Sequence, residues 1–138
     1  MNLNQLKAFI KNSEWQMMAI ESELSQLRTE KEALTQQRAW IDQTIKDAAR
    51  LSDRIHPEQE MTRLAFINQK YEQQESLYLQ IKSLHQHIEQ LSQKLIEAKT
   101  KHKMLCHLME RLGQEQTLQQ QLNQEKCLED LILMRDYS

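Results

Sequence analysis

The fold of this chain is decided by the stretch at residues 52–60, Ser-Asp-Arg-Ile-His-Pro-Glu-Gln-Glu, which contains the only proline, Pro57. A proline inside a helix removes a backbone N–H and clashes with the preceding turn, so a helix rarely continues through it. Proline is favoured instead at the start of a new helix, where acidic residues such as Glu58 and Glu60 complement the helix dipole. The stretch therefore predicts that one helix ends before Pro57 and a second begins there.

The residues before this stretch carry a heptad pattern. Steps of three and four residues, taken alternately from Leu3, reach sixteen positions, of which twelve are apolar; the 39% apolar content of the chain would give about six. These positions are Leu3, Leu6, Ile10, Ser13, Met17, Ile20, Leu24, Leu27, Lys31, Leu34, Arg38, Ile41, Ile45, Ala48, Ser52 and Ile55. A stripe with this 3.5-residue period is typical of a helix that packs against another helix in a left-handed coiled coil.

The residues after Pro57 repeat the pattern, and only His102 is polar among its eleven clearest positions. These positions are Leu77, Ile81, Leu84, Ile88, Leu91, Leu95, Ala98, His102, Leu105, Met109 and Leu112. Between residues 59 and 74 the pattern is weaker, and its apolar residues drift in phase; they are Met61, Leu64, Ile67 and Tyr71. After Leu112 the register slips past Gly113 and resumes only loosely.

Together the two patterns predict one all-α domain over residues 1–138, in which two long helices form an antiparallel coiled-coil hairpin. The expected elements are helix one at about 3–54, a turn at about 55–58 and a longer helix two at about 58–135. A kink in a single long helix is the alternative, but a reversal lets each stripe find its partner within the chain. Pairing from the turn uses up helix one opposite about residue 110, so we expect an unpaired helical tail beyond Gly113.

The composition argues against an enzyme, a nucleic-acid-binding protein and a membrane-spanning protein. A single glycine cannot build a phosphate-binding loop, and two paired helices enclose no cavity for a substrate. We therefore expect no catalytic residues, no bound metal and no cofactor. The net charge of −2 provides no basic field to hold nucleic acid. Apolar runs of a few residues are too short to insert into a bilayer, and residues 1–15 lack the apolar core of a signal peptide.

Histidine and cysteine residues in the second helix raise one further alternative. His102 and Cys106 are four residues apart, as two metal ligands on one helix face would be, but a structural zinc site needs four ligands. A metal sensor would therefore need further ligands, such as His107 and Cys127, from another chain. Cys106 and Cys127 lie about 31 Å apart along one helix, too far for a disulfide. Two reduced thiols are the expectation for a cytosolic protein.

Two sets of surface residues are candidates for binding partners. Basic residues cluster in the second helix, either as a solvated face or as a docking site for an acidic partner; they are Lys94, Lys99, Lys101, Lys103 and Arg111. Aromatic residues cluster near the turn, since antiparallel pairing places Trp40 close to Tyr71. The aromatic set comprises Trp40, Phe66, Tyr71 and Tyr78, and it forms either additional packing or an exposed patch of the kind found at binding hot spots.

The C-terminal third carries a more specific pattern. Lys103, Leu105, Met109, Glu110 and Arg111 precede a glutamine-rich run at residues 114–124, and Lys126, Leu128, Glu129, Asp130, Leu131 and Arg135 follow it. In this pattern, in length and in its unequal helices, the whole chain resembles the stalk proteins of type III export systems, the flagellar FliJ and virulence-system YscO (SctO) group. That group in turn resembles the coiled-coil part of the gamma subunit of rotary F-type ATPases. The chain departs from many members in its abundance of glutamine, which leaves the flagellar and virulence branches open.

The resemblance implies a cytoplasmic, non-enzymatic adaptor located peripherally at the inner-membrane export apparatus. Its terminal coiled coil would enter a hexameric export ATPase, and another surface would contact the cytoplasmic domain of the export gate; binding of substrate chaperones is left open. The ATPase-binding candidates are Arg111, Leu118, Leu122, Lys126, Leu128, Leu131 and Arg135. The gate-binding candidates are Trp40, Phe66, Tyr71 and Tyr78. The main alternative is a self-associating coiled-coil scaffold of an unrelated assembly.

Overall fold

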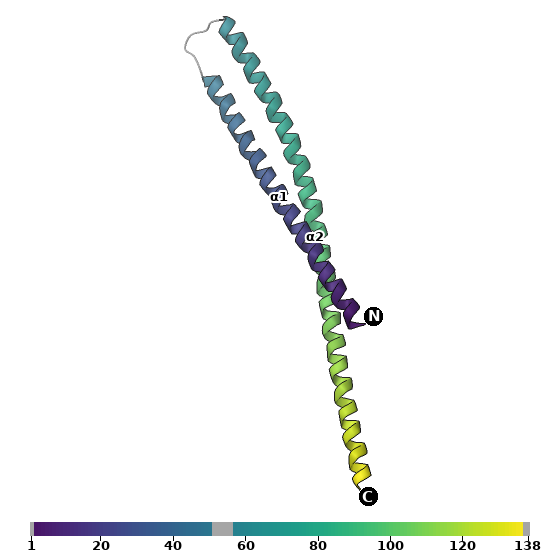
Figure 1. Ribbon diagram of the computed structural model, residues 1–138. Coiled ribbons are helices and arrows are strands. Elements are labelled where there is room, and N and C mark those ends of the chain that lie inside the picture. The colour runs from purple at the N-terminus through teal and green to yellow at the C-terminus, as the bar shows by residue number, and fades with distance from the viewer. Residues whose placement is uncertain (1, 51–56, 137–138) are drawn as a thin grey trace. The chain divides into compact units, whose positions relative to one another are not determined.

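The computed structural model describes residues 2–50 and 57–136, and these residues form two long α-helices (Figure 1). Helix α1 spans Leu3–Arg50 and helix α2 spans Pro57–Asp136. No strand occurs within these two ranges. The all-α fold with a longer second helix is confirmed. The end of helix one expected at 51–54 and most of the expected turn lie outside the described residues.

Local sequence explains how the helices begin and end. At the start of α1 the Asn2 side chain accepts a hydrogen bond from the backbone N–H of Gln5 at 2.8 Å, and the Gln5 side chain accepts one from the N–H of Asn2 at 3.3 Å. This reciprocal capping box satisfies N–H groups that the first turn leaves unpaired. Arg50 lies in the last turn of α1, where a cation is favoured. Helix α2 begins at Pro57 itself, with Glu58 and Glu60 in its first turn.

The chain divides into two compact units, to which both helices contribute. The hairpin unit comprises Ala19–Leu95, and the terminal unit comprises Met1–Met18 together with Ile96–Ser138. In the hairpin unit α1 and α2 run antiparallel, because Leu24 packs with Leu91 while Ile41 packs with Leu77. This pairing confirms the predicted hairpin.

The core of the hairpin unit consists of two leucine- and isoleucine-rich clusters. One cluster contains Leu24, Ile88 and Leu91, and Ile20, Leu27 and Leu95 pack against it. The other contains Ile41, Ile45 and Leu77, and Leu34 and Ile67 pack against it. All of these residues except Ile67 stand at the clearest heptad positions, so the 3.5-residue pattern determines which side chains are removed from water.

The predicted heptad positions are covered throughout the described residues. All fourteen in α1 from Leu3 to Ala48 are buried or half-buried, as are all eleven in α2 from Leu77 to Leu112. Among the residues that the structure describes, Ser13 is the one buried polar residue, at 4% exposure, and it lines a cavity of about 210 Å³ in the terminal unit. Serine is smaller than the leucine that is usual at a heptad position, so the space between the helices at Ser13 is incompletely filled.

The pattern between residues 59 and 74 differs from the expectation. Met61, Leu64 and Tyr71 are exposed, and the covered positions continue the register of Leu77 without drift. Those covered positions are Glu60, Arg63, Ile67, Lys70 and Gln74. Mostly polar side chains therefore occupy this part of the interface; one of them, Arg63, forms an ion pair with Glu60 at 2.7 Å. The interpretation of this region as a drifting apolar stripe was wrong. It traced the apolar residues, whereas the covered residues keep the 3.5-residue heptad period whether they are apolar or polar.

Candidate functional site

The first candidate site is the C-terminal part of α2, in the terminal unit. Every residue from Gln114 to Arg135 is exposed, whereas Leu112 and Gly113 are half-buried. The four predicted leucines, Leu118, Leu122, Leu128 and Leu131, have exposed fractions between 57% and 61%. The predicted Arg111, Lys126 and Arg135 are exposed as well. The whole predicted tail set therefore lies on the accessible surface.

Gly113 marks the end of the covered part of α2 but does not interrupt the helix. The helix is continuous to Asp136, and the Thr117 hydroxyl donates to the Gly113 carbonyl at 2.9 Å across one turn. A methyl group on Gly113 would meet nothing within 4 Å. Close packing therefore does not require this glycine, which weakens the helix at the boundary through its backbone entropy.

We expect Gly113→Ala to strengthen the helix beyond the boundary. Glycine costs about 1 kcal/mol relative to alanine in a helix interior, and the added methyl group finds open space. Amide hydrogen exchange across residues 114–130 should slow about fivefold, which corresponds to that energy. Exchange in the Leu24–Leu91 cluster should not change. Unchanged protection on both sides of residue 113 would show that the glycine does not limit helix stability there.

Exposed apolar residues that the sequence analysis did not select extend this site. Met104, Leu108, Ile132, Leu133 and Met134 are all more than a third exposed. Met104 and Leu108 line a shallow groove of about 460 Å³ together with Leu105, and Lys101, His107 and Arg111 surround it. A detectable signal was present in the sequence, since Met104, Leu118 and Ile132 recur every fourteen residues, close to four helical turns.

The second candidate site is the aromatic set in the hairpin unit, which separates into two pairs. The Lys70 ammonium lies 5.7 Å from the centre of the Trp40 ring and 5.4 Å from that of the Phe66 ring. Tyr71 and Tyr78 instead line a groove of about 400 Å³ with Arg38, whose guanidinium lies 5.0 Å from the centre of the Tyr78 ring. Lys70 of α2, the neighbour of Tyr71, therefore reaches the Trp40 ring. Cation–π contacts at exposed sites contribute about 0.5–1 kcal/mol each and hold the rings in defined positions.

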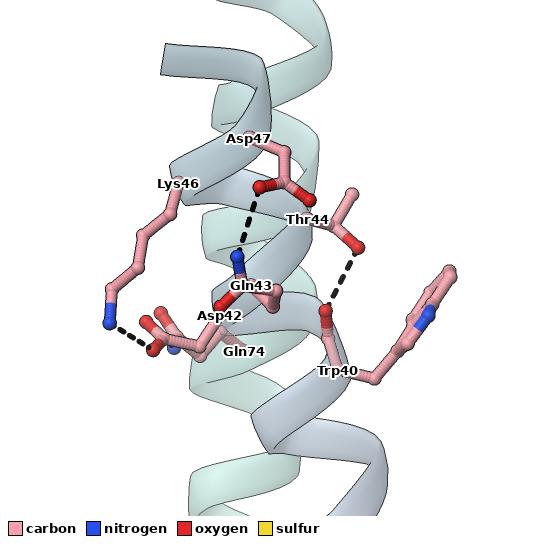
Figure 2. Close-up of polar contacts among 7 residues, drawn as sticks. All are labelled: Trp40, Asp42, Gln43, Thr44, Lys46, Asp47 and Gln74. Atoms are coloured by element: carbon pink, nitrogen blue, oxygen red, sulfur yellow. Dashed lines mark hydrogen bonds and ion pairs between the residues drawn. The ribbon is translucent and has the colours of Figure 1, made fainter. Parts of the chain in front are cut away.

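A group of polar contacts lies near Trp40, and one of them, between Asp42 and Gln74, joins α1 to α2 (Figure 2). Asp42 forms an ion pair with Lys46 at 3.1 Å and accepts a hydrogen bond from Gln74 of α2 at 3.4 Å. Hydrogen bonding from Lys46 and the charge of Lys46, with Gln74 and Arg38, hold the pKa of Asp42 below its usual value. Because that pKa is lowered, the contribution of Asp42 to stability is present above its ordinary pKa and is lost as the pH falls through the lowered value. Figure 2 shows the Trp40 indole directed away from this network.

The histidine–cysteine pair is formed, but it is not part of a larger cluster. His102 Nε2 and Cys106 Sγ lie 3.5 Å apart. Within residues 2–50 and 57–136, no three side chains of the His, Cys, Asp and Glu types gather where they could hold a metal ion. Within the same ranges, no helical segment combines the length and the apolar character needed to cross a bilayer.

Comparison with known proteins adds no relative: no family model, no curated protein and no solved structure matches this chain.

Proposed function

We propose that the chain is a non-enzymatic stalk of a type III export apparatus, which binds a hexameric export ATPase through the exposed end of α2 and couples it to the export gate. The observation that supports the proposal best is the change in burial along α2 at residue 113. Before it, the heptad positions of α2 are covered; after it, every described residue to Arg135 is exposed while four leucines recur among glutamines. Exposed apolar residues on a polar helix are typical of a binding surface.

The dimensions and the chemistry of this segment suit the inside of a ring. A single helix with its side chains is about 10–12 Å across, thin enough for the central channel of a hexamer. Glutamine makes up much of residues 114–124 and offers uncharged hydrogen-bonding groups in all directions. Leucines provide the remaining contact area, and each contributes about 1.5–3 kcal/mol when it is fully buried.

The direct test is binding and stimulation of candidate export ATPases by the full chain. Co-purification of the chain with a hexameric ATPase, together with faster ATP hydrolysis on adding the chain, would support the stalk function. The alternative, a self-associating scaffold of an unrelated assembly, is favoured by the same exposed leucines, because a second copy could cover them. A tight oligomer in light scattering, with no effect on any export ATPase, would favour the scaffold.

The aromatic set is the proposed contact with the cytoplasmic domain of the export gate. Trp40 is 64% exposed, and its side chain does not belong to either apolar cluster. Because Lys70 holds both the Trp40 and Phe66 rings, the surface is preorganised, and little side-chain entropy would be lost on binding.

We expect Trp40→Ala to weaken binding to the gate domain and to leave the stability of the fold almost unchanged. The melting temperature should fall by no more than about 3 °C, because the substitution removes one exposed ring and its contact with Lys70. Binding to the gate domain should weaken at least about tenfold if Trp40 is an anchor, as measured by isothermal titration calorimetry. Phe9→Ala, which also removes an exposed ring but in the terminal unit, is the control and should leave gate binding unchanged. A large loss of stability with Trp40→Ala would assign this ring to packing.

A further inference from the structure

The exposed apolar residues of α2 in the terminal unit form a second stripe, distinct from the heptad positions that α2 uses for its own packing. Met104, Leu118 and Ile132 are spaced by fourteen residues and share one helix face. Their exposed fractions are 68%, 58% and 59%, so no residue within 2–50 or 57–136 covers them. Leu108 and Leu128, both exposed, lie beside this face.

The groove at the upstream end of the stripe defines what it can bind. Its apolar floor is formed by Met104, Leu105 and Leu108, and its basic rim includes His107 and Arg111. Residues 94–111 contain five Lys and Arg residues but only two Glu residues. A suitable occupant therefore has apolar side chains next to acidic ones.

The downstream end of the same helix has this chemistry. Residues 114–135 contain four acidic and two basic residues, and Glu125, Leu128, Glu129 and Ile132 lie close together near its end. This segment cannot fold back onto the groove of its own chain, because α2 is one continuous helix. Twenty residues separate Leu108 from Leu128, which is about 30 Å along the axis. A second copy can bring the two ends together.

In one antiparallel register, apolar residues face apolar residues and charged residues face residues of opposite charge. In this register Leu118 lies opposite Leu118 of another copy. Any two residues at the same level along the axis therefore have numbers whose mean is 118. The facing apolar pair is then Met104 with Ile132, and Leu108 and Leu128 flank the interface. The facing pair of complementary charge is Arg111 with Glu125, and His107 faces Glu129. Near the end of the overlap one like-charged pair, Lys101 with Arg135, opposes the pairing.

From this agreement we propose that the exposed α2 stripe is a homodimer interface, in which two copies pair antiparallel about a twofold axis at Leu118 while each hairpin stays closed. The axis makes the interface isologous, so each favourable pair occurs twice. The overlap from Met104 to Ile132 extends for about 43 Å of helix. The inference does not depend on the proposed stalk function, since it needs no ATPase and no export gate.

The first test exchanges charges in the full chain. Arg111→Glu and Glu125→Arg should each weaken the dimer about tenfold in analytical ultracentrifugation, because each places two like-charged pairs across the interface. The double variant restores opposite charges in the reverse order and should return the affinity to near that of the parent chain. A parent chain that is monomeric at about 100 µM, or a double variant as weak as the single variants, would overturn the proposal.

The second test locates the axis. In a background with Cys106→Ser and Cys127→Ser, Leu118→Cys should crosslink between copies with a short bis-maleimide, because the two thiols meet at the axis. Leu131→Cys is a matched control of nearly equal exposure, at 61%. Its two thiols would be about 39 Å apart in this register and should not crosslink. Equal crosslinking at both positions would exclude the register. A failure of either test would leave stimulation of an ATPase, and with it the proposed function, untouched.

Discussion

Leu91→Asp is expected to unfold much of the hairpin unit. Leu91 is 6% exposed and packs with Leu24 and Ile88 in one of the two apolar clusters. The substitution removes this packing and places a carboxylate among the aliphatic side chains of the cluster. We expect a loss of about 4 kcal/mol, a large share of the 5–15 kcal/mol that stabilises a typical domain. In urea the unfolding midpoint should fall by about 2 M, as followed by far-UV circular dichroism.

Leu79→Asp provides the matched control. It introduces the same charge in the same helix, but Leu79 is 58% exposed and belongs to neither cluster. Its unfolding midpoint should shift by less than about 0.5 M. Equal effects of the two variants would mean that helix propensity, and not the apolar seam between α1 and α2, determines stability. That result would contradict the role assigned to the heptad positions.

The fold could be predicted because the 3.5-residue heptad period determines which residues of the helices are covered. Every described position reached by the 3.5-residue step from Leu3 is covered, including the polar Ser13, Lys31 and Arg38. The same period explains the one misjudged region. Glu60, Arg63, Lys70 and Gln74 are covered although they are polar, since a long helix keeps its register wherever it has a partner. Apolar content alone is misleading in such a region, because long polar side chains can cover an interface with their aliphatic parts.

The candidate sites were only partly predictable. Exposure of the C-terminal leucines followed from the unequal lengths of the two helices, which the position of Pro57 sets. The contacts of Lys70 with the Trp40 and Phe66 rings could not be predicted in this way. They depend on the rotation of α1 against α2 and on the direction of the side chains. The groove beside Met104 was missed for a similar reason. Met104 and Leu108 lie outside the heptad positions, and only their exposure distinguishes them from packing residues.

Removal of residues 114–138 is expected to abolish stimulation of the export ATPase while the hairpin unit stays folded. The described part of this segment, to Arg135, is exposed throughout, so its loss should leave the Leu24 and Ile41 clusters intact. The urea midpoint should change by less than about 0.5 M. Loss of four leucines from an interface should weaken ATPase binding by at least about 100-fold, since even partial burial of each contributes about 1 kcal/mol. Surface plasmon resonance and ATP hydrolysis rates measure the two effects.

A full-length variant in which Leu118, Leu122, Leu128 and Leu131 are all serine separates the apolar contacts from the length of the helix. It keeps the glutamines and the charges, so it should lose ATPase binding as the truncation does if the leucines provide the contact. Replacing four glutamines of the 114–124 run by serine is the matched control, and it should retain most of the stimulation. Full stimulation by the truncated chain would exclude the tail as the ATPase-binding element and would transfer that role to another surface. Loss with the truncation but not with the leucine variant would mean that helix length and polar contacts suffice.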